Sequence, residues 1–122
     1  MTNHKFDLQP RLINFAVSSL TLIERLPDTM GARILAHQLA KSSTSAALNY
    51  GEVQANESPK DFIHKMSICL KELRESQISM TIILHKLYLP EPDVLPTLKE
   101  CSELVAIFFS SIKTKKQSIQ QR

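Results

Sequence analysis

Polar side chains recur at helical spacing in the middle of the chain, within segments that are otherwise apolar. Carboxylates, amides, hydroxyls and ammonium groups that share one helix face could bind a ligand, exchange protons or hold a partner. We call this set the polar stripe, and its members are Gln38, Lys41, Ser42, Ser45, Asn49, Glu52, Asp61, Lys65, Lys71, Glu72 and Glu75.

A helical hairpin that turns near residues 56–57 would bring the two halves of the polar stripe together. Ser42 would then lie near residues 72–75, and Asn49 near residues 65–68. One interpretation is a buried, hydrogen-bonded network that fixes the register of the hairpin, because buried polar groups are costly unless paired. It predicts that replacing Asn49 or Glu72 by Ala lowers the free energy of unfolding by roughly 1–3 kcal/mol. The alternative is a ligand or partner site.

Glu72 and Glu75 are the pair of carboxylates that could form a hydrolase dyad. Carboxylates three residues apart are ordinary on helices, and no arrangement of a nucleophile with a base accompanies them. We therefore predict no catalytic residue and expect that the protein is not an enzyme.

The four histidines are the other candidates for site chemistry, because helical bundles hold di-iron centres through Glu-x-x-His pairs. The residues three positions before His37, His64 and His85 are Ile34, Asp61 and Ile82. A single Asp-x-x-His, whose Asp61 also suits a helix start, is a weak metal motif. Two isolated glycines cannot build a phosphate-binding loop. We expect no metal and no cofactor.

Four segments show the period of amphipathic helices, and the pattern predicts them at about 9–26, 30–55, 59–89 and 93–116. Their apolar seams repeat at intervals of three and four, and they include Leu12, Phe15, Leu22, Leu26, Leu35, Leu39, Ala46, Val53, Phe62, Met66, Cys69, Leu73, Met80, Ile83, Leu87, Val94, Leu98, Cys101, Val105, Phe108 and Ile112. Short breaks make successive helices antiparallel. The predicted fold is all-α: one domain over residues 1–122, an up-and-down antiparallel four-helix bundle.

Prolines and capping residues mark the predicted helix boundaries. Pro10 suits a first turn, Pro27 ends the first helix, and Asp28–Thr29 offers N-caps for the second. Ser58–Asp61 has the form of a strong helix start, with Ser58 as the N-cap. The Pro-Glu-Pro sequence at residues 90–92 ends the third helix.

The formal net charge of +3 is unevenly distributed. Residues 1–112 hold 11 Lys and Arg against 12 Asp and Glu, whereas the last ten hold Lys113, Lys115, Lys116 and Arg122 without an acid. We predict a basic tail over residues 113–122, outside the folded body, that solubilises the chain end. The alternative is that Lys113, Lys115 and Lys116 contact nucleic-acid phosphates. The aromatic residues follow the apolar seams, so base stacking is not indicated.

Several features favour a cytoplasmic protein with no membrane partner. No stretch approaches the roughly 18 apolar residues of a membrane span, and residues 1–9 lack the apolar centre of a signal peptide. Cys69 and Cys101 fall within apolar helical patterns, which predicts two buried thiols and suits a reducing compartment.

Apolar residues also occur away from the main seams. They are Ile34, Leu48, Ile63, Leu70, Ile78, Ile82 and Phe109. A second apolar face suggests assembly into a homo-oligomer, and a wide core stripe is the competing interpretation.

The hairpin region resembles a known bacterial four-helix-bundle family. Residues 38–52 read QLAKSSTSAALNYGE, residues 57–65 read ESPKDFIHK, and residues 70–76 read LKELRES. Together they are similar to the signature of the family that includes the protein encoded in intervening sequences of large-subunit ribosomal RNA genes. The family's recurrent polar positions correspond to Ser42, Ser45, Asn49, Glu52, Asp61, Lys71, Glu72 and Glu75.

The resemblance implies a four-helix bundle that assembles as a homopentamer. Some relatives are basic accessory subunits of reverse transcriptases and bind both nucleic acid and the enzyme. This chain departs from them in its nearly neutral body and in Lys41, which stands where the family often has Arg. Two hypotheses follow: a non-catalytic oligomeric module that binds RNA, DNA or a nucleic-acid enzyme, or a protein-interaction scaffold with no nucleic-acid role.

Overall fold

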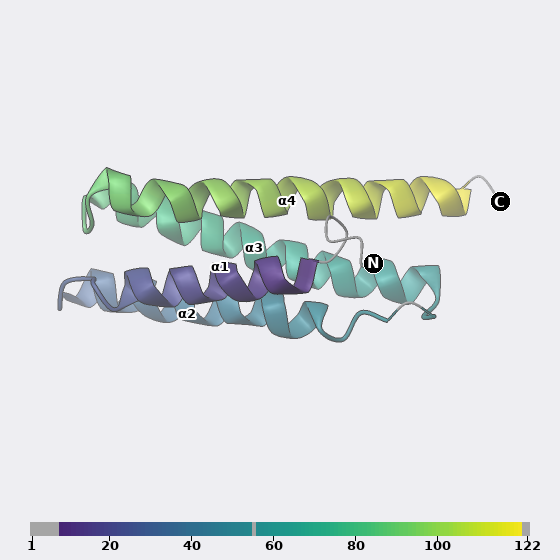
Figure 1. Ribbon diagram of the computed structural model, residues 1–122, viewed down its shortest axis with the longest axis horizontal. Coiled ribbons are helices and arrows are strands. Elements are labelled where there is room, and N and C mark those ends of the chain that lie inside the picture. Colours follow the sequence, from purple (N-terminus) through teal and green to yellow (C-terminus); the bar gives the residue numbers. More distant parts are fainter. Residues whose placement is uncertain (1–7, 55, 121–122) are drawn as a thin grey trace.

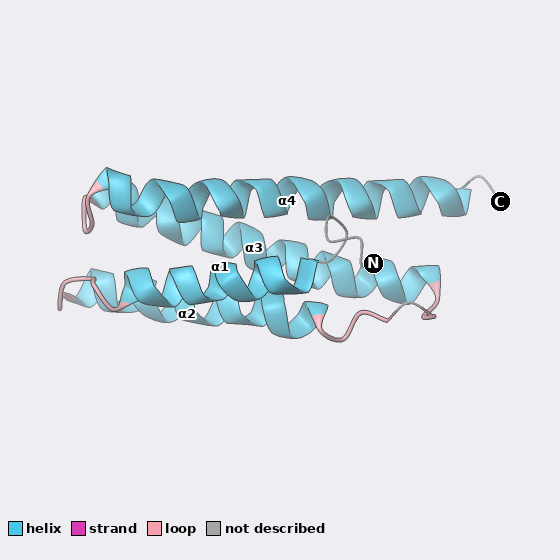
Figure 2. Ribbon diagram, in the orientation of Figure 1, coloured by secondary structure: helices cyan, strands magenta, loops and turns pink. Residues whose placement is uncertain are grey.

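The computed structural model describes residues 8–54 and 56–120, and four helices make up most of this part of the chain. They are α1 (Leu8–Ile23), α2 (Met30–Tyr50), α3 (Pro59–Lys86) and α4 (Glu91–Gln120). Figure 1 shows the four lying side by side and alternating in direction, and Figure 2 shows that short loops join them. The all-α, up-and-down four-helix fold is therefore confirmed.

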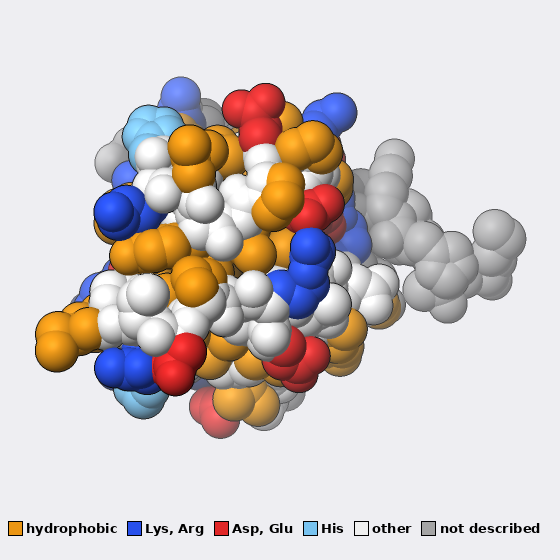
Figure 3. All heavy atoms as spheres, turned by 90° about the vertical axis from the view of Figure 1, so that its left-hand side faces the viewer, with side chains coloured by type: hydrophobic (Ala, Val, Ile, Leu, Met, Phe, Trp, Pro, Cys, Tyr) orange, Lys and Arg blue, Asp and Glu red, His pale blue; other side chains and the backbone are white. Residues whose placement is uncertain are grey.

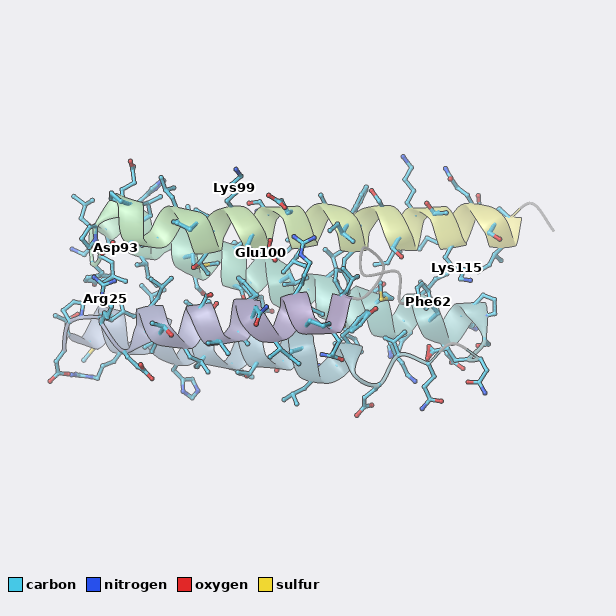
Figure 4. The ribbon with its side chains drawn as sticks, in the orientation of Figure 1. Arg25, Phe62, Asp93, Lys99, Glu100 and Lys115 are labelled. Atoms are coloured by element: carbon cyan, nitrogen blue, oxygen red, sulfur yellow. The ribbon has the colours of Figure 1, made fainter. Side chains whose placement is uncertain are left out.

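The core consists of the apolar seams that the periodicity predicted. Its most buried large side chains belong to all four helices and include Leu12, Phe15, Leu39, Met66, Leu73, Met80, Ile83, Val94, Leu104 and Phe108. Contacts are extensive where α1 meets α2, α2 meets α3 and α3 meets α4, and they are sparsest where α4 meets α1. Ion pairs support that sparse side: Arg11 with Glu100 at 2.6 Å and Arg25 with Asp93 at 2.7 Å, the latter visible in Figure 4.

Two of the predicted N-caps are present. The Thr29 side chain accepts a hydrogen bond from the amide of Ala32, and the Ser58 side chain accepts one from the amide of Asp61. Pro59 occupies the first turn of α3, as predicted. These caps satisfy amides that have no partner inside their helices.

Three helices end earlier than the sequence predicted. The chain leaves α1 after Ile23 through a tight turn, because the residue before Pro27 disfavours helical geometry. Helix α2 stops at Tyr50 with Gly51 as its C-cap, so the prediction that it continues to residue 55 was wrong for residues 51–54; residue 55 lies outside the described residues. Helix α3 stops at Lys86 because Leu87 adopts a left-handed conformation, with φ of 59°. Leu87 therefore leaves the seam and is 75% exposed.

Helix α4 is longer than predicted at both ends. It begins at Glu91, because Pro92 is tolerated in a first turn, and it continues through Gln120. The predicted helix ended at about residue 116, so residues 117–120 of the predicted basic tail are helical instead, and residues 121–122 lie outside the described part. Lys113, Lys115 and Lys116 are helical residues with fixed spacing. At this end α3 and α4 extend beyond the start of α1 (Figure 1).

Much of the second apolar face reaches the surface. Ile34, Leu48, Ile78, Ile82 and Phe109 are each at least 46% exposed, whereas Ile63 and Leu70 are partly buried against the core. Figure 3 looks onto the end that holds the α1–α2 and α3–α4 loops, and hydrophobic side chains lie there among charged ones. None of the described helices is both long enough and apolar enough to cross a membrane.

Candidate functional site

The centre of the polar stripe is one buried hydrogen bond between α2 and α3. The hydroxyl oxygens of Ser42 and Ser76 lie 2.7 Å apart, and both side chains are almost fully buried. The hairpin register predicted Ser42 near residues 72–75, so the true partner is one position farther along. This hydrogen bond fixes the register of α2 against α3, as expected if the polar stripe has a structural role.

The other members of the polar stripe do not form one buried network. The side-chain amide of Asn49 donates to the Ser45 carbonyl in its own helix, at 2.8 Å. The Lys65 ammonium lies 3.0 Å from the Glu52 carbonyl and 3.5 Å from a Glu57 carboxylate oxygen, and so holds the α2–α3 loop. The exposed members are Gln38, Lys41, Glu52, Asp61, Lys71 and Glu75. The polar stripe therefore consists of one buried hydrogen bond, a lysine that holds the α2–α3 loop, and side chains that are exposed to solvent.

Glu72 is the unusual carboxylate of the stripe. Its side chain is half-buried, and its Oε1 atom is buried with no hydrogen-bond partner among the described residues. Desolvation is the main cause that raises the pKa of Glu72, and the neighbouring Glu75 raises it further, while Lys71 and Lys41 oppose the shift. A carboxylate in this position costs free energy in its charged form.

The two cysteines are buried thiols, as predicted. Both side chains are inaccessible, and the Cys101 thiol donates to the Leu73 carbonyl at 3.2 Å. Burial raises the pKa of Cys69 to about 12 and that of Cys101 to about 12. Thiols with such values are protonated at neutral pH and react poorly as nucleophiles.

Nothing in the described ranges resembles a metal centre, since no three His, Cys, Asp or Glu side chains gather there. His37, His64 and His85 are all exposed on their helices, and His4 lies outside the described residues.

A groove between α3 and α4 joins apolar and cationic side chains on one surface. Its volume is about 430 Å³. Leu70, Ile78, Phe109 and Ile112 supply apolar lining, and Lys71, Arg74, Lys116, Glu75 and Ser67 complete it. Helical periodicity does not reveal this groove, because its lining residues are about 40 positions apart and come together only when the two helices pack.

Lys115 points to a different surface from Lys116. Its ammonium lies 5.3 Å from the centroid of the Phe62 ring, a cation–π contact between α4 and α3 that Figure 4 shows. Around this contact the hydroxyls of Ser110, Ser111, Thr114 and Ser118 line a hollow of about 510 Å³. The three lysines thus divide between two sides of α4, because residues three apart share a helix face and adjacent ones do not.

Charge is segregated along α4. All four of its acids, Glu91, Asp93, Glu100 and Glu103, lie in its first half, and residues 104–120 hold Lys113, Lys115 and Lys116 with no acid. Three of the acids pair with arginines: Glu100 and Glu103 with Arg11 of α1, and Asp93 with Arg25 in the turn after α1. The second half of α4 is therefore a cationic surface on the end that projects beyond α1.

The family comparison covers most of the chain. A family model described as 23S rRNA-intervening sequence protein matches residues 5–110. This chain belongs to the 23S rRNA-intervening sequence protein family. The match confirms the resemblance seen in the hairpin region, and it ends before Lys113, so the lysines of α4 lie beyond the matched part.

A solved structure supports the fold of this intervening-sequence family member. It is a protein with unknown function from the S23 ribosomal protein family of Bacteroides thetaiotaomicron. The two chains are 24% identical, the TM-score is 0.78, and the likeness covers 87% of this chain and 98% of the other. At this identity the likeness establishes the four-helix fold alone. No curated protein matches the chain.

Proposed function

We propose that this protein is a non-catalytic, homo-oligomeric helical module that binds nucleic acid through its phosphate backbone. The observation that carries the proposal is the second half of α4, where three lysines occur along 17 helical residues without an acid. Helical geometry fixes the spacing of the lysine Cα atoms and places Lys113 and Lys116 on one face, which suits this pair to successive phosphates better than a mobile tail would.

Unpaired cations on the neighbouring face extend this surface. In contrast to Arg11, Arg25, Arg33 and Lys65, which have acidic partners, the cations of the groove have no ion pair within the described part of the chain; they are Lys71, Arg74 and Lys116. Phosphates that bind there need not displace an internal partner. The Glu75 carboxylate, which also lines the groove and interacts with Glu72, repels phosphates. The favoured path for a nucleic-acid strand therefore follows α4.

The test is fluorescence anisotropy with labelled single-stranded RNA, duplex RNA and duplex DNA at two salt concentrations. We expect binding that weakens steeply with salt, because phosphate contacts release condensed counterions. The double variant Lys113→Gln/Lys116→Gln should bind less tightly and reduce the slope of log affinity against log salt by about 1.4, at roughly 0.7 per phosphate of a single strand.

Lys99 offers the matched control. It also lies on α4, is exposed, and points away from the bundle in Figure 4, but it belongs to the acidic half of the helix. Lys99→Gln should leave both affinity and salt slope unchanged. Absence of binding at low salt, or an equal loss in Lys99→Gln and the double variant, would refute the phosphate-binding role.

Self-association is supported by the exposed apolar residues of the outer faces. Ile34 is 56% exposed, Leu48 71% and Ile82 46%, on α2 and α3. Surfaces of this kind favour burial against another chain. Family membership makes a pentamer the expected assembly, so sedimentation equilibrium should give five times the 13.8 kDa chain mass, and Ile82→Glu should lower it. A monomeric parent at micromolar concentration would count against assembly.

The same exposed residues favour the second candidate, a protein-interaction scaffold without a nucleic-acid role. The two are distinguished by the anisotropy experiment, because a scaffold shows no salt-dependent affinity for RNA. A cytoplasmic location suits both candidates, since the buried free thiols of Cys69 and Cys101 fit a reducing compartment.

A further inference from the structure

We infer that the groove between α3 and α4 receives an unpaired nucleobase, which stacks on the ring of Phe109. This inference rests on the proposed function and specifies the form of nucleic acid that the surface selects. Its starting point is the contrast between two adjacent aromatic residues. Phe108 is fully buried in the core, whereas Phe109 is 51% exposed and lines the groove.

The groove has the composition that a base requires. A nucleobase presents flat apolar faces, and unpaired bases are recognised by stacking on exposed aromatic side chains. Beside Phe109, Leu70 and Ile78 of α3 and Ile112 of α4 supply an apolar surface, and the volume of about 430 Å³ exceeds that of a single base.

The cations of the groove are placed to hold the phosphates on either side of that base. Lys71 and Arg74 belong to α3, and Lys116 to α4, so positive charge lies on both walls. The lysine spacing carries this charge along α4 to Lys113, which shares a face with Lys116. An aromatic platform within a cationic track is the arrangement that binds single strands with little sequence preference.

A duplex fits this groove poorly. Its bases are stacked and paired, and removing one costs unstacking free energy that a single strand does not incur. Double-stranded RNA offers the cationic rim only its phosphates and 2′-hydroxyls. Selectivity for single strands over duplexes should therefore depend on Phe109. Affinity for phosphates should not depend on Phe109.

The chain contains no tryptophan, so an introduced indole is the only one and reports on its own site. Phe109→Trp places a single indole in the groove, and its half-exposed position tolerates the larger ring. We expect single-stranded RNA to quench the emission of this indole through stacking. Duplex RNA of equal length should bind with similar salt dependence and leave the emission unchanged.

A second set of variants separates stacking from apolar contact. Phe109→Leu keeps the groove apolar and removes the aromatic face, so single-strand affinity should fall about tenfold while duplex affinity is unchanged. Phe109→Tyr should retain parental affinity. Val17→Ala, at a 56% exposed apolar site on α1, is the matched control and should bind as the parent does.

Three outcomes would overturn the inference. The first is that Phe109→Leu loses duplex affinity and single-strand affinity equally. That result would remove the stacking role of Phe109 and leave phosphate binding as the proposed function. The second is a blue shift of the Phe109→Trp emission as protein concentration rises without RNA, which would assign the groove to contact between protein chains. The third is no binding of any nucleic acid at low salt, which would remove the proposed function as well.

Discussion

The hydroxyl oxygens of Ser42 and Ser76 lie 2.7 Å apart in the interior of the bundle, where most buried side chains are apolar. Each hydroxyl satisfies the other, so together they cost little, although either alone would be a buried polar group without that partner. A slip of the α2–α3 hairpin would separate them. The pair therefore favours the observed register over alternatives that the repeating apolar seams alone would tolerate.

The serine pair leads to the first prediction. Ser42→Ala or Ser76→Ala should each lower the free energy of unfolding by about 1–3 kcal/mol, because each leaves the opposite hydroxyl unpaired. The double variant should cost less than the two single variants combined. Urea denaturation followed by circular dichroism measures all three. Ser110→Ala, at an exposed site on α4, should change the value by less than about 0.5 kcal/mol.

The charged Glu72 side chain should destabilise the fold at neutral pH. A paired buried network would predict the opposite, namely that replacing Glu72 lowers the free energy of unfolding. The folded-state pKa of Glu72 is raised above its ordinary 4.5, chiefly by desolvation. The folded protein therefore binds a proton more readily than the unfolded chain, and stability falls as pH rises from about 4.5 through the folded pKa. Glu72→Gln should raise the free energy of unfolding at pH 7.

Thermal melts across pH provide the check for Glu72. The advantage of Glu72→Gln should shrink as pH falls and largely disappear where the parent carboxyl is protonated in both states. A variant less stable than the parent at pH 7 would mean that the carboxylate has a favourable partner and that the buried Oε1 atom does not determine its energetics.

The third prediction concerns the pair between α1 and α4. The Arg11 guanidinium makes two hydrogen bonds to Glu100, at 2.6 and 3.0 Å, across the least packed side of the bundle. Both side chains are about one-third exposed, so the pair should contribute about 1 kcal/mol, and less at high salt. A double-mutant cycle with Arg11→Gln and Glu100→Gln measures the coupling. The more exposed Arg33–Asp28 pair should show a smaller coupling, and equal values would contradict this ranking.

Leu87 occupies a position that favours glycine. The amides of Leu87 and Tyr88 donate to the carbonyls of Leu84 and Ile83, which is a Schellman ending with a left-handed residue after the helix. A Cβ atom in that conformation costs about 1 kcal/mol. Leu87→Gly should therefore raise the melting temperature. Leu87→Ala keeps the Cβ and should not, so an equal rise in both variants would assign the gain to loss of the exposed leucine side chain.

The sequence determined the fold because apolar spacing and helix caps are local signals. Thr29, Ser58 and Pro59 occupy the predicted boundary positions. Errors arose where a nonlocal contact or an unusual conformation decided the outcome. The left-handed conformation of Leu87 has no sequence signature, and the length of α4 beyond residue 116 depends on polar residues that carry no apolar period.

The site was less predictable than the fold. Helical spacing identified Ser42 but could not separate it from the exposed Gln38 or Glu52, because burial is set by the neighbouring helix. Periodicity did separate Phe108, on the core seam, from the adjacent Phe109, but it could not show that Phe109 lines a groove with residues of α3. A shift of one residue along a helix thus separates a core position from a surface position.

The sparse contact between α1 and α4 has a kinetic consequence. Arg11 and Glu100 are 89 residues apart, whereas the other main helix contacts join helices that follow one another along the chain. Hairpins of neighbouring helices close small loops and can form early, but bringing α1 to α4 closes almost the whole chain and belongs late in folding. Contacts made after the transition state act mainly on the rate of unfolding. The α1–α4 side should therefore govern how long the folded bundle lasts, while the α2–α3 and α3–α4 hairpins govern how quickly it forms.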